Sequence, residues 1–482
     1  MKYQSSKNSN IRVGIIGGGI GGATIALRLS EQGANVVLFE KESSLVNGPP
    51  MCHLHAGGNL YREISDQQCI DLLKQSISTA RLYRDAIDYR PTIVAVPTTD
   101  NGHPSDVIDR LKVLQTEYAK LIAADSKNQV LGPASQYFKL YDREAVEELT
   151  KHPTPAKPES PDQWMIAFAK HVDLNQLKFP LILVQEYGIS VFRLAAITSL
   201  TLEKRTNCQL LTNTQVSSVT QSKHDSTWTI EAKKAGETHT VEVDYLINAC
   251  GFRTGTIDDM VGLRPKRMVE FKAAYISHWS SHQNNWPEII FYGARGTKNG
   301  MTQLTPYPNG YFQIHAMTPD VTLFEDGLVS SELESAQPQL PIKFITKVDK
   351  KWDPETVNSR TTKAINKVAG FMPSFGNATV GGPPMFGAQQ IPGVDSTLRV
   401  ADVSFGHDRY ARCEIVKASS ALPAANTIIN HLVEHDMLHE GKAQITASPE
   451  SLTEIEISQR AENLAIERNF PKDLAGRTKP SS

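Results

Sequence analysis

Apolar runs and glycines alternate over the first forty residues in a way that predicts one strand–helix–strand unit. Residues 11–16 are apolar and β-branched, which is typical of a buried parallel strand. Residues 21–32 carry apolar side chains at helical spacing and stop before Gly33, a common residue after a helix end. Residues 35–39 form a second apolar run that ends at Glu40. This order predicts one βαβ unit.

The pattern changes after this unit. Residues 152–161 are rich in proline and predict a surface excursion. We expect the tail beyond about residue 470 to be loose. The helical segments predicted are 66–89, 105–124, 189–205, most of 340–370, and 410–434. The strands predicted are 208–221, 226–232, 238–248 and 397–402, with an antiparallel sheet from 267–277, 288–294, 301–305 and 310–316.

Composition narrows the class of protein. The chain has 482 residues, 50 Lys plus Arg against 52 Asp plus Glu, and a formal net charge of -2. This balance argues against a nucleic-acid partner, which normally requires a basic excess. Its five cysteines form no CxxC pair, which favours reduced thiols over disulfides or a zinc site. No secretory signal and no transmembrane stretch is predicted, so we expect a cytoplasmic location and leave peripheral membrane contact open.

The glycines between the first strand and the first helix carry the chemical signal. Residues 17–22 read GGGIGG and contain Gly17-x-Gly19-x-x-Gly22. Gly17 permits a tight turn, Gly19 lets a pyrophosphate approach the backbone, and Gly22 lets the helix pack on the strand. The helix N-terminus then faces the phosphate charge. The strand before and the helix after these glycines make them a dinucleotide-binding motif.

Glu40 indicates which dinucleotide binds. It lies 18 residues beyond Gly22, where a carboxylate accepts ribose hydroxyls and repels a 2′-phosphate, so NADP is disfavoured. The motif leaves NAD and FAD open. An NAD dehydrogenase normally continues with further βα units, whereas this chain continues with a His- and Gly-rich segment and then helices.

Four separated segments resemble the FAD-dependent oxidoreductases of the D-amino-acid oxidase (DAO) superfamily, which have a glutathione-reductase-type FAD fold. They are VGIIGGGIGGATIALRLSEQGANVVLFEK, HLHAGGNLY at 53–61, NTQVSSV at 213–219 with DYLINACGF at 244–252, and LRVADVSFGHDRYARCEIVKA at 398–418. The resemblance spans roughly residues 10–435. It is most similar to L-2-hydroxyglutarate oxidase/dehydrogenase and, more faintly, to malate:quinone oxidoreductase. The segment before HAGG lacks the usual Ser/Arg-rich run, so the substrate does not transfer.

The resemblance implies an α/β fold, with a Rossmann-like FAD-binding domain and an interleaved antiparallel-sheet substrate domain. We expect residues 1–95, 165–265 and 371–440 in the first, 96–164 and 266–370 in the second, and 441–482 as a C-terminal extension. In the family, a Val beside the adenine and an Ala-x-Gly turn near the pyrophosphate match Val216, Ala249 and Gly251. The full expected set of FAD contacts is Gly17, Gly19, Gly22, Glu40, Lys41, Gly57, Gly58, Val216, Ala249, Gly251, Asp402 and Gly406.

His55 is the first candidate for catalysis, because the resemblance places its loop against the flavin. It would act as a general base or as a covalent flavin link; the alternative is a structural histidine that packs the loop. Cys52 and His53 are weaker candidates for a covalent link. The His53-x-His55 pair lacks a second cluster of ligands, so no metal is expected.

Other candidates lie later in the chain. Arg295 is suited to a substrate carboxylate, because a guanidinium forms a fork to that group; its alternative is to cap a hairpin. His315 is a weaker candidate base, and of Tyr307 and Tyr311 we expect one to be core. Gly406 and His407 precede the predicted helix 410–434, whose N-terminus would stabilise negative charge on the reduced flavin. His407 has a solvated loop as its alternative.

The sequence therefore predicts an FAD-dependent oxidoreductase that oxidises a small carboxylate-bearing substrate at a CH–OH or CH–NH carbon, by hydride transfer to flavin N5. Oxygen or a quinone would accept the electrons. A flavin-binding protein without small-substrate turnover, partner-binding or tRNA-modifying, and an NAD-only dehydrogenase are the alternatives.

Overall fold

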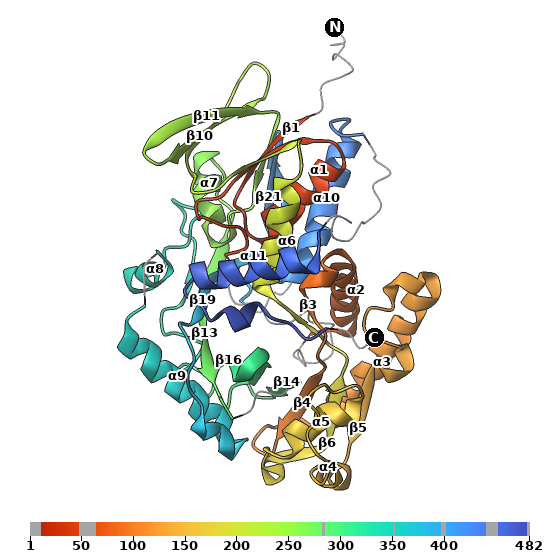
Figure 1. Ribbon diagram of the computed structural model, residues 1–482. Coiled ribbons are helices and arrows are strands. Elements are labelled where there is room, and N and C mark those ends of the chain that lie inside the picture. The colour runs from red at the N-terminus through yellow and green to blue at the C-terminus, as the bar shows by residue number, and fades with distance from the viewer. Residues whose placement is uncertain are drawn as a thin grey trace.

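A six-stranded sheet forms the upper half of the molecule in Figure 1. The structure is a computed structural model, and it describes residues 11–47, 64–281, 285–349, 352–396, 402–439 and 452–479. The strands follow the order β20-β21-β12-β1-β2-β8, and all are parallel except the edge strand β20. Their bounds are β1 Arg12–Ile16, β2 Asn35–Phe39, β8 Cys208–Leu211, β12 Tyr245–Asn248, β20 Asp402–His407 and β21 Tyr410–Glu414.

Alternating side chains of this sheet build two different cores. Val13, Ile15, Val36 and Leu38 face the helices, while Val37 and Phe39 face a three-stranded sheet. The helices are α1 Ile20–Glu31, α6 Val191–Glu203 and α10 Ala421–Glu434. The three-stranded sheet consists of β9 Gln215–Gln221, β10 Trp228–Lys234 and β11 Glu237–Val243. The βαβ unit predicted for residues 11–40 is confirmed.

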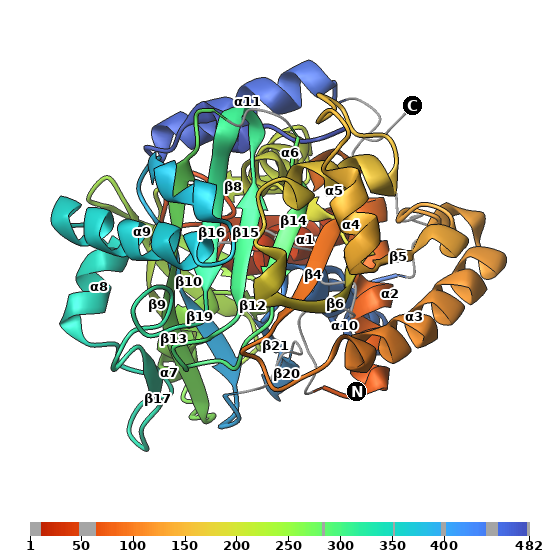
Figure 2. The ribbon, with the colours of Figure 1, turned by 90° about the horizontal axis from the view of Figure 1, so that it is seen from below.

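A ten-stranded, mostly antiparallel sheet forms the lower half, and Figure 2 shows it from below. Its path is β17-β13-β16-β15-β14-β4-β6-β5, and β18 and β19 also pair with β13. The strands are β4 Thr92–Pro97, β5 Phe138–Tyr141, β6 Leu177–Val184, β13 Arg267–His278, β14 Glu288–Phe291, β15 Thr302–Pro306, β16 Tyr311–Ala316, β17 Leu328–Ser330, β18 Thr379–Val380 and β19 Met385–Pro392. This sheet thus includes β6, β19 and residues 92–95 of β4, which the expected domain bounds place in the FAD-binding domain.

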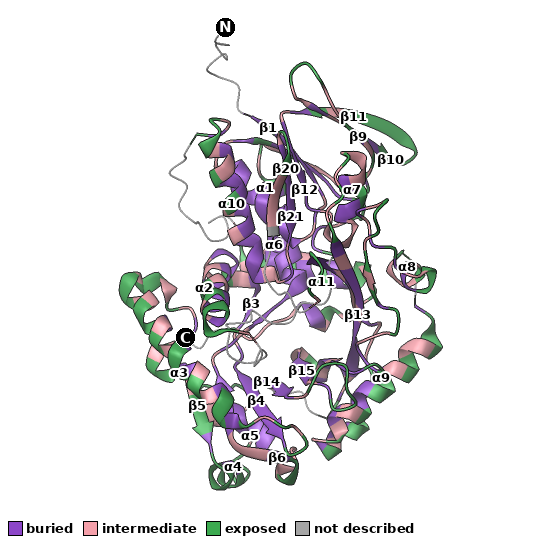
Figure 3. Cartoon of the chain, turned by 180° about the vertical axis from the view of Figure 1, so that it is seen from behind, coloured by how far each residue is buried: buried purple, intermediate pink, exposed green. Residues whose placement is uncertain are grey.

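Helices and small elements complete the molecule. The helices α8 Ile342–Asp349 and α9 Pro354–Ala369 cover one face of the ten-stranded sheet, where Phe271, Phe312 and Trp352 are buried. The remaining helices are α2 Asp66–Leu82, α3 Pro104–Ala124, α4 Arg143–Leu149, α5 Pro161–Ala169, α7 Thr254–Met260 and α11 Glu454–Glu467, with a small pair of strands, β3 Ile87–Asp88 and β7 Gly188–Ile189. Buried residues concentrate in the strands and in α1, α6 and α10 (Figure 3). No helix among the described residues has the length and apolarity needed to cross a bilayer.

The C-terminal segment is packed, which corrects the expectation of a loose tail as far as residue 479. Helix α11 crosses the front of the molecule at the level where the two halves meet (Figure 1) and lies along its outer side in Figure 2, and Leu474 and Ala475 beyond it are fully or nearly fully buried. Arg468 donates to the backbone oxygens of Leu45 at 2.7 Å and Val46 at 3.1 Å. The backbone N–H of Thr478 donates to Asp88 at 2.8 Å. This segment therefore braces the loop that follows Glu40.

Residues 410–434 do not form the single helix that the sequence predicts. Residues 410–414 are strand β21, and the helix begins only at Ala421. Tyr410, Ala411 and Cys413 are buried in β21, between β12 and the edge strand β20, and pairing with β12 determines their conformation. Apolar residues at mixed spacing allowed either interpretation.

Candidate functional site

The glycine turn between β1 and α1 lies at the carboxyl edge of the parallel strands. Gly17 has φ +103°, and a side chain there would lie 2.4 Å from the Ala249 carbonyl oxygen. A Cβ atom on Gly22 would lie 1.9 Å from the carbonyl oxygen of Gly17, so both positions require glycine for packing. A Cβ atom on Gly19 would meet nothing within 4 Å. The turn is closed against protein at Gly17 and Gly22 and open at Gly19.

The open side of this turn is also the N-terminus of α1. Gly19 is the N-cap and supplies no side-chain cap, and the first turn holds no acidic residue. The first N–H groups of a helix have no partner within the helix, and they carry partial positive charge. The turn therefore presents donors and space at the same place, as a pyrophosphate requires.

Glu40 follows β2 at the same edge and is 9% exposed. Its Oε2 accepts a hydrogen bond from the Gly18 N–H at 2.7 Å, and its Oε1 accepts one from the Glu42 N–H at 2.8 Å. Burial raises the pKa of Glu40, against the opposing effect of these two N–H groups. A carboxylate offers about four acceptor positions, so each oxygen retains one for a ribose hydroxyl.

Two further segments surround this position. The N–H of Thr214 donates to the backbone carbonyl oxygen of Glu40 at 2.9 Å, which brings the start of β9, with the half-buried Val216, beside the acid. The Ala249 N–H donates to the Ile16 oxygen at 2.8 Å, and Gly251 at φ +60° has no atom within 4 Å of its would-be Cβ. The donors, the open glycines and the buried acid together fit an FAD or NAD molecule that lies across the edge of the sheet.

Lys41 extends the site toward the second half of the molecule. Its Nζ lies 3.4 Å from an oxygen of Asp349 in α8, and Arg253 donates to both oxygens of Asp349 at 3.0 Å. Lys41 is thus held between the nucleotide edge and the helices of the ten-stranded sheet.

The hairpin β20–β21 places His407 and Gly406 away from the glycine turn. His407 pairs with Tyr410, at the level of Leu246 and toward the amino ends of the parallel strands. Its ring packs edge-on against Trp228 at 5.3 Å, and Gly406 faces Leu263. His407 and Gly406 thus lie at the opposite edge of the sheet from the glycine turn, because β21 runs from them to the carboxyl edge before α10 begins. The catalytic assignment of His407 and the flavin assignment of Gly406 are therefore corrected.

The backbone of Asp402 pairs with that of Glu414, near the carboxyl edge of the sheet, so its assignment remains a prediction. The loop with Cys52, His53, His55, Gly57 and Gly58 lies outside the described residues. Their assignments remain predictions.

One face of the ten-stranded sheet is polar and turns toward the six-stranded half. In β13, Phe271, Ala273 and Tyr275 face the α8/α9 core, whereas Ile276 joins the core of the six-stranded half. Glu270 and Lys272 share the face of Ile276 because side chains alternate along a strand. The Tyr307 and Tyr311 side chains also pack against that core, and Tyr307 donates to Gln313 at 3.1 Å.

Arg295 and His315 meet on this face. Arg295 forms an ion pair with Glu270, whose other oxygen lies 2.7 Å from Lys272. The loop of Arg295 is tied to the end of β16, because the Gly296 N–H donates to the Met317 oxygen at 2.9 Å. Burial, with the nearby charges of Lys272, Lys417 and Arg295, lowers the pKa of His315 to about 3. We refer to Glu270, Lys272, Arg295, His315 and Lys417 as the cation cluster.

The cation cluster lies beside the junction of β21 and α10. Lys272 donates to Gln389 at 2.7 Å, and Gln389 in turn donates to the Val416 oxygen at 3.0 Å. Val416 precedes Lys417 and lies just beyond the carboxyl end of β21. The cluster thus lies near the edge that holds the glycine turn and the acid. Arg295 and His315 are predicted from the sequence, whereas Lys272 is not, although Glu270 and Lys272 are two charges in the apolar run RMVEFKAAYISH.

A buried ionic network also escaped the sequence analysis. The carboxylate of Asp258 in α7, fully buried, accepts from Arg267, from Arg412 at 3.1 Å and from Tyr410 at 2.6 Å. Glu414 lies 3.1 Å from Arg412 and 3.4 Å from Arg267. The network joins β21 of the six-stranded sheet to β13 of the ten-stranded sheet, so it fixes the two halves at the site.

Comparisons with known proteins agree with this geometry. A model of the family "FAD dependent oxidoreductase" (DAO) matches residues 12–164. The solved structure of glycine oxidase from Geobacillus kaustophilus is similar, with a TM-score of 0.55 and 14% identity over 92% of this chain and 100% of that chain. No curated protein matches the sequence significantly.

Two other solved structures share the fold. Glycerol-3-phosphate dehydrogenase from Bacillus halodurans, complexed with FAD, has a TM-score of 0.56 and 14% identity over 97% of this chain and 74% of that chain. NikD, described as an unusual amino acid oxidase essential for nikkomycin biosynthesis, has a TM-score of 0.58 and 12% identity over 92% and 99%. Residues 12–164 therefore match the FAD-dependent oxidoreductase (DAO) family, and the chain shares the fold of these flavoenzymes.

Proposed function

We propose that the protein oxidises a small carboxylate-bearing molecule at a CH–OH or CH–NH carbon. The cation cluster is the observation that carries this proposal. Arg295 offers a guanidinium fork for a carboxylate, and Lys272 lies on the same sheet face with Glu270 between them. Arg295 itself is exposed and open to a ligand from solvent, while Lys272 beside it is half-buried, so less water screens a charge-assisted contact made there.

We propose that Gly17, Gly19 and Gly22 with the first turn of α1 hold the pyrophosphate of FAD, and that Glu40 holds the ribose. Ala249 and Gly251 lie beside the pyrophosphate, Val216 and Lys41 toward the adenine end. When bound, FAD supplies the two-electron acceptor for the substrate hydride. The polar face of the ten-stranded sheet holds the substrate and excludes water from it.

A base must take the heteroatom proton of the substrate. A ring whose pKa lies near 3 is a weak base at neutral pH, so His315 suits a neutral hydrogen-bonding role toward the substrate. We assign the proton to His55, which the family resemblance places against the flavin. We do not assign the proton to His407, which packs beside Trp228 at the other edge of the sheet.

The names of structurally similar proteins span both chemistries, since they include a glycine oxidase and a glycerol-3-phosphate dehydrogenase. The test is anaerobic mixing of the FAD-loaded protein with 2-hydroxy acids, amino acids and glycerol 3-phosphate, followed by the flavin absorbance. Bleaching by a hydroxy acid or an amino acid supports the proposal and identifies the bond oxidised. Bleaching by glycerol 3-phosphate alone, or by none of the panel, contradicts it. Reoxidation of the bleached protein by oxygen or by a quinone then identifies the electron acceptor.

A further inference from the structure

A second concave region lies outside the nucleotide edge and the cation cluster. It is a groove of about 790 Å³ between the end of α2, the loop after α3, the proline-rich segment 157–161 and the C-terminal residues Thr478 and Lys479. Its volume falls within the range of about 300–1,000 Å³ that is typical of small-molecule sites. We call it the basic groove.

Charge distinguishes the basic groove from the rest of the surface. Its lining holds five cations, Arg81, Arg84, Lys127, Lys157 and Lys479, and one acid, Glu159. The chain as a whole has a formal net charge of -2, so this excess is local. The five cations come from four separate segments that converge on one hollow. Convergence in a concave region focuses the potential on a single bound anion.

Neighbouring acids satisfy only part of this charge. Arg81 donates to Asn128 at 2.7 Å and lies 3.0 Å from Asp125. Lys479 lies 3.7 Å from Glu454. Lys127 and Lys157 form no ion pair within the described part of the chain. The groove therefore retains cationic side chains that are available to a ligand.

An aromatic wall closes the inner side of the basic groove. The rings of Tyr89 and Tyr187 lie 5.3 Å apart at 55°. Within the described part of the chain, no residue forms a hydrogen bond with the Tyr187 hydroxyl. The hydroxyl lies close to Gly132, 3.9 Å from where a Cβ atom of that residue would be. Burial raises the pKa of Tyr187, so this hydroxyl remains a donor at neutral pH. A planar ring with anionic groups matches a tyrosine wall beside cations.

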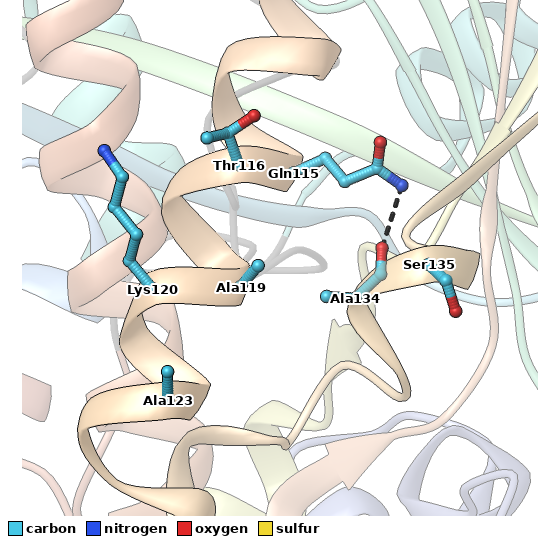
Figure 4. Close-up of a pocket in the computed structure, with 7 residues that line it drawn as sticks. All are labelled: Gln115, Thr116, Ala119, Lys120, Ala123, Ala134 and Ser135. Carbon is cyan, nitrogen blue, oxygen red and sulfur yellow. Dashed lines mark hydrogen bonds between the residues drawn. The ribbon is translucent and has the colours of Figure 1, made fainter.

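The peptide from Tyr89 to Pro91 separates this groove from the polar sheet face. Tyr89 and Pro91 line the groove, whereas Arg90 between them is buried and forms an ion pair with Glu288 of β14. A different hollow on α3 has Lys120 as its only charged lining residue, and its Gln115 amide is already bonded to the Ala134 oxygen at 2.8 Å (Figure 4). That second hollow offers no comparable recognition.

We propose that the basic groove binds a nucleotide, a small molecule in which phosphates with at least two negative charges are joined to a planar ring. The phosphates lie among Lys127, Lys157 and Arg84, and the ring packs against Tyr89 and Tyr187. This site is additional to the FAD site and to the substrate site.

The test uses protein saturated with FAD, so that the glycine turn is occupied, and ADP as the probe in isothermal titration calorimetry. We expect saturable binding without release of flavin. The double variant K127E/K157E should weaken ADP binding at least about 10-fold, because it reverses two charged contacts. The matched control K233E/K234E, on the exposed end of β10, changes the net charge equally and should bind as the wild type does.

Tripolyphosphate, which has no ring, tests the ring, and Y187F tests the Tyr187 hydroxyl as a donor to the nucleotide base. Y187F should weaken ADP and leave tripolyphosphate unchanged. Absence of ADP binding, equal loss in the two double variants, or displacement of FAD would overturn the proposal. Equal binding of tripolyphosphate and ADP would overturn the aromatic part of the site, and therefore the proposal that the ligand is a nucleotide.

Discussion

The carboxylate of Glu40 accepts a hydrogen bond from the Gly18 N–H at 2.7 Å, so the acid assigned to the ribose also fixes the glycine turn assigned to the pyrophosphate. The two proposed contacts with FAD are therefore coupled through one side chain. E40Q should weaken FAD binding by about 1.5–3 kcal/mol, because a charged hydrogen bond is lost. The measurement is the dissociation constant of FAD from reconstituted apoprotein. E42Q, a change of an exposed neighbour, should retain FAD like the wild type; equal losses in the two variants would contradict the assignment.

Gly19 and Gly22 should respond in opposite ways to substitution. A side chain on Gly19 meets open space, so G19V should fold with normal thermal stability as apoprotein and yet fail to bind FAD. G22V places a side chain against the Gly17 carbonyl oxygen and should lower the free energy of unfolding by about 1–3 kcal/mol, the usual cost of overpacking. Thermal unfolding without FAD, followed by flavin content, separates the two effects. A G19V protein that purifies yellow would refute the pyrophosphate site.

Asp258 should be a stability residue rather than a catalytic one. D258N removes a buried charge that faces Arg267 and Arg412, and breaking one partner of a buried ion pair costs about 3–5 kcal/mol. Urea unfolding should show this loss, while E231Q on the exposed face of β10 should change little. An unchanged midpoint for D258N would mean that the network does not hold the two halves together.

His315 should make the protein sensitive to acid. Its pKa is about 3 in the folded chain and near 6.5 when unfolded, so below pH 6.5 the unfolded state binds a proton that the folded state refuses. His315 does not change the free energy of unfolding above pH 6.5. Between pH 6.5 and pH 3 it lowers this free energy by up to about 1.4 kcal/mol per pH unit, and by less where solvent reaches the ring and screens the charge.

The check is unfolding free energy from pH 7.5 to pH 4.5. H315N should flatten this dependence, whereas H407N, at the exposed hairpin, should follow the wild type. Parallel curves for wild type and H315N would contradict the burial of a neutral ring beside the three cations.

Local sequence was sufficient for the nucleotide edge. The unit from β1 to Glu40 depends on contacts between near neighbours, and its glycines and acid lie where their spacing predicts. The cation cluster depends on pairing between β13 and β16, about forty residues apart, and on the return of β19 and β21. No local pattern encodes such register, so Arg295 was found by chemistry and Lys272 was missed.

The hairpin at residues 402–414 shows the same limit. His407 sits in the run SFGHDRYARC, which suits either a loop before a helix or a hairpin. The neighbouring strand β12 decides between them by pairing with Tyr410–Arg412, and that contact spans more than 160 residues. The hairpin therefore places His407 at the opposite edge of the sheet from the glycine turn, where we propose that FAD binds.

The most direct test of the account is the substrate dependence of anaerobic flavin reduction in R295Q. With the carboxylate substrate that bleaches the wild type, R295Q should retain full FAD and require at least about 10-fold more substrate for half-maximal reduction, because a charged contact of about 1.5–3 kcal/mol is lost. R460Q, which alters an exposed arginine on α11, should match the wild type. An R295Q protein that is half-reduced at the wild-type substrate concentration would contradict the central claim that the cation cluster binds the substrate carboxylate.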